Sequence, residues 1–197
     1  MKPELALLVW AVLLTFVQML VAVTGATLQV GLPALAGNRE GLAQCTGWAG
    51  RAWRAHHNML ESLVMFASLV LVAVIAGKTN SATLLGAQIF FWARLAYAVA
   101  YLAGIPWLRT GVWCVSLIGL AIMPLGNVVS RRYEAEADWS ALRATHDPAA
   151  AASVFRKFSR DDLVQPNPPL WSYIWIDNHP TIVQRIAMAR AYAERRR

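Results

Sequence analysis

Residues 51–61 carry charged and polar side chains whose types and spacing could bind an anion inside a membrane. These residues are Arg51, Arg54, Asn58 and Glu61, spaced three, four and three apart. On a helix of 3.6 residues per turn this spacing places them on one face. A charged side chain at the centre of a bilayer costs about 2.5–3.5 kcal/mol, so it is kept where it faces a protein interior or a ligand. The face is therefore a candidate binding site.

A second polar face in residues 81–104 has the same geometry. Its members are Arg94, Tyr97 and Tyr101, spaced three and four apart. At a rise of 1.5 Å per residue, Glu61 and Arg94 each lie about 15 Å from the same end of two antiparallel segments. We therefore expect the two faces to meet, with an ion pair between Glu61 and Arg94 that offsets the burial of both charges.

Three further arginines lie near that end of the segments and would remain as surplus positive charge. They are Arg51, Arg54 and Arg109. An excess of cations around a cavity favours an anionic ligand. Taken singly, the residues have structural alternatives: Arg51 and Arg54 could extend to the membrane surface, and tyrosines often pack at the membrane interface. Their joint occurrence at matched depths favours a binding site.

The segments that position these residues are long and apolar. Of the 197 residues, 57% are hydrophobic and 15% are charged, whereas a soluble protein has about 25% charged residues. A spanning helix needs roughly 20 mostly apolar residues. Four segments meet this requirement: 4–30, 51–77, 81–104 and 107–128. The loops between the last three are short, which implies antiparallel neighbours, so we expect an all-α, integral membrane four-helix bundle in an inner or cell membrane.

The composition changes sharply near residue 124, and polar, charged residues follow. Either Asn127 or Ser130 could cap a new helix there, and Asp147 followed by Pro148 predicts the start of another. We therefore expect two domains: a four-span membrane domain, residues 1–123, and a soluble, mostly helical C-terminal extension, residues 124–197.

The net charge of +7 does not indicate nucleic-acid binding, because several arginines lie inside predicted spans and the others are interleaved with acids. The two cysteines, Cys45 and Cys114, define neither a disulfide framework nor a metal-ligand spacing. The adjacent His56 and His57 lack the partner residues of a common metal motif.

The R-A-H-x-N-x-x-E core that begins at Arg54 resembles the signature of the membrane-associated proteins in eicosanoid and glutathione metabolism, the MAPEG family. The Arg94-x-x-Tyr97-x-x-x-Tyr101 run and Arg109 are similar to residues of that family's third and fourth helices. The resemblance covers residues 1–123. It implies a homotrimer of four-helix subunits in the lipid bilayer, with the co-substrate glutathione bound between neighbouring subunits and a lipophilic small molecule as the second substrate.

The resemblance also implies roles for individual residues. Those that would hold glutathione are Arg51, Arg54, His56, Asn58, Glu61, Arg94, Tyr97 and Tyr101. The catalytic candidates are Arg109, which would stabilise the thiolate, and Tyr97. A free thiol has a pKa of about 8.5, and a nearby guanidinium favours the nucleophilic thiolate. The implied activity is that of a glutathione transferase or peroxidase, with thioether conjugates or reduced hydroperoxides as products.

The C-terminal part carries a second resemblance. The run Ser130-Arg-Arg-Tyr-Glu-Ala-Glu-Ala-Asp138 and the later Asn178-His179-Pro180 with Arg185-Ile186 resemble segments of CAAX prenyl protease-type zinc metallopeptidases. In that pattern Glu134 would be a zinc ligand and Asp138, one helical turn on, would orient it, with His179 and Arg185 near the substrate. The HExxH motif, which supplies two histidine ligands and the general base, is absent. We therefore expect neither bound zinc nor peptidase activity.

Two alternatives to a glutathione-dependent enzyme remain open at this stage. One is a non-enzymatic membrane scaffold, and the other is a fusion that carries an incomplete, inactive zinc peptidase segment. The membrane orientation is also open, because Arg131 and Arg132 favour a cytoplasmic tail, whereas Arg39 on the opposite side favours the reverse.

Overall fold

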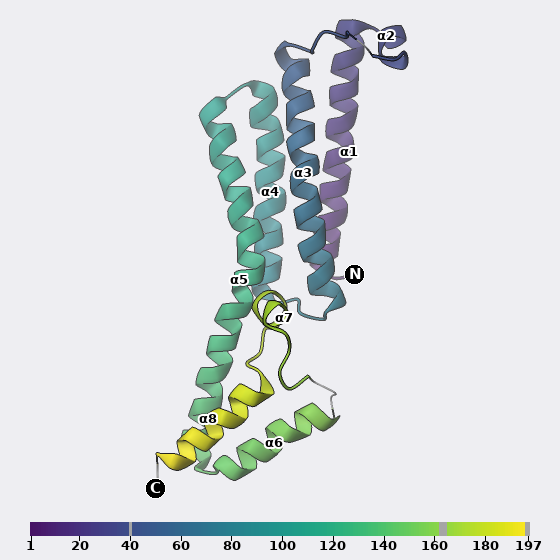
Figure 1. The fold of residues 1–197 in the computed structure, drawn as a ribbon. Coiled ribbons are helices and arrows are strands. Elements are labelled where there is room, and N and C mark those ends of the chain that lie inside the picture. The colour runs from purple at the N-terminus through teal and green to yellow at the C-terminus, as the bar shows by residue number, and fades with distance from the viewer. Residues whose placement is uncertain (40, 162–164, 196–197) are drawn as a thin grey trace. The chain divides into compact units, whose positions relative to one another are not determined.

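The computed structural model describes residues 1–39, 41–161 and 165–195. This part of the chain contains eight α-helices and no strand (Figure 1). The helices are α1 (Pro3–Val30), α2 (Leu32–Ala36), α3 (Gly47–Ile75), α4 (Ser81–Ala103), α5 (Pro106–Thr145), α6 (Pro148–Asp161), α7 (Leu170–Trp175) and α8 (Ile182–Glu194). The chain divides into two compact units, Met1–Met123 and Pro124–Arg197. The predicted all-α class is confirmed.

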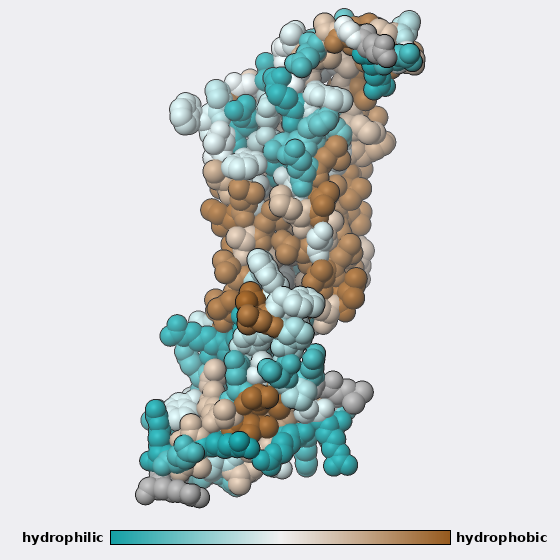
Figure 2. Space-filling view, in the orientation of Figure 1, coloured by the Kyte–Doolittle hydropathy of each residue, from teal (hydrophilic) through white to brown (hydrophobic). Residues whose placement is uncertain are grey.

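Four helices, α1, α3, α4 and the first part of α5, lie side by side in the first unit (Figure 1). Each of the four is long and apolar enough to cross a membrane. Figure 2 shows hydrophobic residues over much of the outer surface of this unit. Bulky apolar residues such as Val64, Trp92 and Val99 are largely exposed there, which suits contact with lipid chains. The predicted membrane four-helix bundle is confirmed.

Hydrogen bonds fix the start of α4 and tie it to α1. The Asn80 Oδ1 atom accepts hydrogen bonds from the backbone N–H groups of Ala82 and Thr83, both at 2.9 Å, and the Thr83 hydroxyl accepts from the Asn80 N–H at 2.8 Å. Such a reciprocal cap satisfies donors that a helix start leaves unpaired. The Thr83 hydroxyl also donates to the buried carboxylate of Glu4 at 2.9 Å. The first turns of α1 and α4 are therefore joined.

The core of the first unit is formed by side chains from all four spanning helices, with Leu120 and Met123 contributed by α5. Phe66 of α3 stacks on Phe90 of α4 with ring centroids 4.2 Å apart. Met59 of α3 and Ala11 of α1 are fully buried in the same cluster. These contacts hold the spanning helices together next to the polar faces predicted from the sequence.

Two glycines allow α4 and α5 to approach closely. A Cβ atom added to Gly86 would lie 2.6 Å from the Gly119 carbonyl oxygen, and one added to Gly119 would lie 2.7 Å from the backbone nitrogen of Phe90. Both distances are too short for real side chains. Small residues at helix–helix contacts are typical of membrane bundles, where association depends on close packing.

The α5 helix continues through Pro124 to Thr145. The predicted new helix start at Asn127 or Ser130 is therefore wrong. Pro124 removes one intrahelical hydrogen bond, and membrane helices tolerate such a loss. Instead of capping a helix, the Asn127 side-chain amide donates to the Trp175 carbonyl oxygen at 3.0 Å.

The second unit is built around α6, α8 and the last part of α5. The predicted start of α6 is confirmed, because the Asp147 carboxylate accepts from the Ala150 N–H at 2.8 Å and Pro148 is the first helical residue. Leu142, Ala152, Ala189 and Tyr192 form the buried core of this unit. Tyr192 also shares a 2.8 Å hydrogen bond with His146.

The close contact of Gly119 with the α4 backbone predicts that a larger residue at this position destabilises the protein. We expect Gly119→Ala to destabilise the protein by about 1–3 kcal/mol, because the new methyl group overlaps the α4 backbone. The control is Gly111→Ala in the same helix, where an added Cβ meets nothing within 4 Å. That change should be neutral or slightly stabilising, because alanine is the better helix former. Thermal unfolding in detergent measures both, and equal melting temperatures for the two variants would contradict the close approach.

Candidate functional site

Arg94 of α4 is the largest fully buried side chain of the described residues, with 0% exposure. Its Nη1 atom donates to Asn58 Oδ1 at 2.9 Å, and its Nε atom donates to the Met59 sulfur at 3.3 Å. Both partners lie on α3. The Nη2 atom is also buried and has no hydrogen-bond partner within the described part of the chain. The site therefore contains a buried cation with an unused donor.

The predicted meeting of the two polar faces occurs, but with a different partner for Arg94. Where an ion pair with Glu61 was expected, the described residues show Arg94 bonded to the neutral amide of Asn58. Glu61 lies one turn further along α3 and is exposed on the surface of the single copy. The expected ion pair is therefore wrong. Spacing alone does not distinguish two positions that are one turn apart on the same face.

Two tyrosines and two arginines stack in a row beside this contact. The Arg94 Cζ atom lies 4.5 Å from the centroid of the Tyr97 ring, and the Arg109 Cζ atom lies 4.7 Å from that of Tyr101. The two rings meet edge to face at 5.3 Å. A guanidinium over an aromatic face is stabilised by the negative potential of that face. The row fixes Arg109 of α5 against α4.

A cavity of about 190 Å³ opens beside this row. Its lining residues are Asn58, Tyr97, Tyr101, Arg109, Thr110 and Trp113. None of these six is acidic, and together they offer an amide, hydroxyl groups and a guanidinium. Four of them were predicted as site residues. The arrangement can bind an anion or hold a thiolate.

The other predicted residues do not line this cavity. Arg51 donates from Nε to the Leu102 carbonyl oxygen at 3.0 Å, and its side chain lies beside Gly104. Arg54 is exposed on α3, as is Glu61. His56 is buried, and its Nδ1 atom has no hydrogen-bond partner among the described residues. A role for these four in ligand binding stays a prediction.

Two cavity residues on α5 were missed from the sequence. Trp113 lies four residues after Arg109, which places both on one helix face, so helical spacing was an available signal. Thr110 donates its hydroxyl to the Pro106 carbonyl oxygen at 3.1 Å, a local contact common in any helix. Nothing in its type or spacing marked it as a site residue.

The family model described as "MAPEG family" matches residues 4–129 of the chain, which is more than half of its length. The chain belongs to the MAPEG family. With its four apolar helices, this membership makes the protein an integral, multi-pass membrane protein. It also places the protein in a family with glutathione-related transferase and peroxidase roles.

A second match concerns the C-terminal region. A curated protein of Bacillus subtilis (strain 168), described as "Uncharacterized metalloprotease YhfN", is 34% identical over 74 residues, which are 38% of this chain and 17% of that protein. The MAPEG chain therefore covers about a sixth of the length of that relative. No solved structure matches.

The metallopeptidase-like residues come together in the second unit, where they form an ion-pair cluster. Arg185 donates to both carboxylate oxygens of Asp138, at 2.7 and 2.6 Å. Glu134 pairs with His179 and lies 3.9 Å from the Arg185 guanidinium. Within the described ranges there is no group of three or more His, Cys, Asp or Glu residues that could hold a metal ion. The carboxylate of Glu134, the predicted remnant ligand, is engaged by His179 and Arg185.

The two-point contact of Asp138 with Arg185 predicts a large effect of mutation. Their side chains are 13% and 16% exposed, so Asp138→Ala leaves a poorly solvated guanidinium and should destabilise the second unit by on the order of 3 kcal/mol. Glu136→Ala is the control, because Glu136 and its partner Arg132 are 61% and 84% exposed and such pairs contribute less than about 1 kcal/mol. Amide hydrogen exchange in α6 and α8 measures both, and equal protection in the two variants would contradict the assignment.

Proposed function

We propose that this MAPEG protein is a glutathione-dependent transferase or peroxidase that binds glutathione between subunits and activates its thiol toward a lipophilic electrophile. The observation that carries the proposal is the guanidinium of Arg109, held over Tyr101 at a cavity without acidic lining residues. Arg94 adds positive potential next to the cavity, because it is hydrogen-bonded to the cavity residue Asn58 and its buried Nη2 atom has no hydrogen-bond partner among the described residues. Membership in the family supports the choice of glutathione as the ligand.

The proposed chemistry begins with the thiol. The thiol loses its proton to water, Arg109 stabilises the thiolate that forms, and the Tyr97 hydroxyl in the same cavity donates a hydrogen bond to the sulfur. The thiolate attacks an electrophilic carbon, so that a C–S bond forms and the leaving group departs with its electron pair. With a hydroperoxide, two glutathione molecules are oxidised to the disulfide while the hydroperoxide is reduced to an alcohol and water.

The remaining predicted residues would hold the rest of the glutathione molecule. Its two carboxylates suit Arg51 and Arg54, because arginine pairs with carboxylates through two parallel hydrogen bonds. Its amino group suits the carboxylate of Glu61. We place His56 at the edge of this site. It lies on α3 with Arg51, Arg54 and Glu61, but its side chain is buried and does not line the cavity.

A homotrimer explains why charged side chains lie on the surface of a spanning helix. Arg54 and Glu61 are exposed on α3 of the single copy, and charged groups that face lipid are strongly unfavourable. In the proposed trimer a neighbouring subunit covers them, so that the glutathione site forms at the subunit boundary. The lipophilic second substrate then enters from the bilayer.

We further propose that residues 1–123 are the functional membrane domain and that residues 124–197 are a metallopeptidase-like extension without peptidase activity. The division into two compact units supports this organisation. The ion pairs of Glu134 and Asp138 support a structural role for the carboxylates of the extension.

Glutathione should stabilise the detergent-solubilised protein. We expect a rise in melting temperature at millimolar glutathione, because a ligand that binds only the native state stabilises it by mass action. Arg54→Ala should reduce this shift, since it removes a proposed carboxylate partner. Arg132→Ala is the control, because Arg132 is exposed and lies in the second unit. No shift in the parent, or equal shifts in both variants, would overturn the proposed site.

The proposed lack of peptidase activity in the extension predicts a low zinc content. Protein purified without chelator should contain less than one zinc ion per chain, because Glu134 is engaged by His179 and Arg185 and the two HExxH histidines are absent. A chelator should leave the melting temperature unchanged. Stoichiometric zinc together with chelator-sensitive proteolysis would disprove this role for the extension.

A further inference from the structure

Gln18 lies inside the first spanning helix and has no polar partner. Its side chain is buried, with 7% exposure, and neither Nε2 nor Oε1 has a hydrogen-bond partner among the residues that the structure describes. The nearby Thr15, also on α1, differs because its hydroxyl donates to the Ala11 carbonyl oxygen at 2.8 Å. An amide buried without a partner is unfavourable, so Gln18 requires an explanation.

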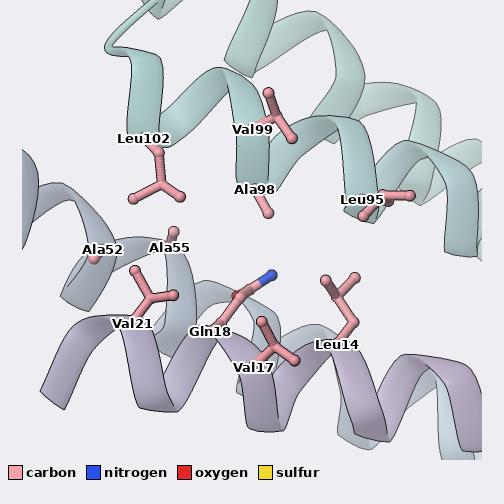
Figure 3. Close-up of a pocket in the computed structure, with 10 residues that line it drawn as sticks. All are labelled: Leu14, Val17, Gln18, Val21, Ala52, Ala55, Leu95, Ala98, Val99 and Leu102. Carbon is pink, nitrogen blue, oxygen red and sulfur yellow. The ribbon is translucent and has the colours of Figure 1, made fainter. Parts of the chain in front are cut away.

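The amide nitrogen of Gln18 is directed toward an apolar cavity of about 190 Å³ between α1, α3 and α4 (Figure 3). Nine other residues line this cavity, and all of them are aliphatic. The small side chains of Ala52, Ala55 and Ala98 leave the space that the amide faces. Val17 and Val99, on the rim, are 47% and 63% exposed, so the cavity opens on the apolar outer surface of the single copy.

The composition of the wall restricts what can occupy this cavity. A buried water molecule typically makes about three hydrogen bonds, and the only polar side chain among the ten lining residues is that of Gln18, whose single amide group would have to supply all of them. An ion would lack a counter-charge. A molecule with one polar group and an apolar body meets both requirements, because the amide can donate and accept hydrogen bonds at once.

We propose that this cavity binds a neutral, single-chain lipid alcohol or amide, whose polar group pairs with Gln18 and whose hydrocarbon chain leaves past Val17 and Val99 into the bilayer. The site is separate from the proposed glutathione site, because the two cavities share no lining residue. Ala55 lies between them, since it lines the lipid cavity and also packs against Tyr97 and Tyr101. The proposal does not depend on the proposed function.

The test compares 1-dodecanol with dodecane, two probes of equal chain length, on the full-length protein in lipid nanodiscs. We expect 1-dodecanol to raise the melting temperature saturably and dodecane to have little effect. In Gln18→Leu the melting temperature without probe should rise, because the unpartnered amide is gone. The half-saturating concentration of 1-dodecanol should increase about tenfold in this variant, because the hydrogen bond to its hydroxyl group is lost.

Gln29→Leu is the matched control in the same helix. The Gln29 amide is fully used, because it donates to the Thr46 carbonyl oxygen and accepts from the Thr46 N–H, both at 3.0 Å. This variant should therefore lose stability but keep the response to 1-dodecanol. Gln18→Met, of similar volume, serves if Gln18→Leu does not fold.

Two melting-temperature results would overturn the proposal. One is an equal response of the parent protein to 1-dodecanol and dodecane. The other is a 1-dodecanol response that survives in the Gln18 variants. A diazirine-bearing dodecanol gives an independent readout, since it should label residues 14–21 and 95–102 in the parent and not in Gln18→Leu. Labelling spread evenly over the spanning helices would show general partition into lipid and would also disprove the site.

Discussion

The hydrogen bond between Arg94 and Asn58 is the contact on which the polar interior of the spanning unit depends. A guanidinium with no exposed surface needs partners within the protein, and Asn58 and Met59 supply them from α3. This contact sets the register of α3 against α4. It also fixes Tyr97 under the guanidinium, and through the ring of Tyr101 it locates Arg109 of α5. One buried cation thus organises side chains from three helices.

The partner of Arg94 is neutral, and this has a chemical consequence. A carboxylate would cancel the charge and leave a structural ion pair of low potential. An amide satisfies one donor and leaves the positive charge in place. The glycine contact holds the backbones of α4 and α5 together at Gly86 and Gly119, ten residues further along α5 than Arg109. The same two helices are therefore joined at the site by the stacking of Arg109 on Tyr101 and, further along, by close backbone packing.

The sequence predicted the four spans, the convergence of two polar faces and four of the six cavity residues, because helical spacing and the cost of charge in lipid are strong constraints. It did not predict the partner of Arg94, since Asn58 and Glu61 differ by one turn and only side-chain packing separates them. The path of α5 through Pro124 was missed because a proline usually ends a helix in water. Gln18 was overlooked, since a single amide in an apolar span has no periodic pattern.

The depth of Arg94 would also make the binding of an anion depend on the voltage across the membrane. Moving one elementary charge across the whole bilayer changes its energy by about 2.3 kcal/mol per 100 mV. Arg94 is nine residues before the end of α4 at Ala103, or roughly 14 Å at the rise of a helix, which is near the middle of the hydrocarbon core. An anion that travels to this depth crosses up to about half of the potential. Its occupancy then depends on the polarity of the membrane, and the sign of that dependence reports which face of the bilayer the site opens to.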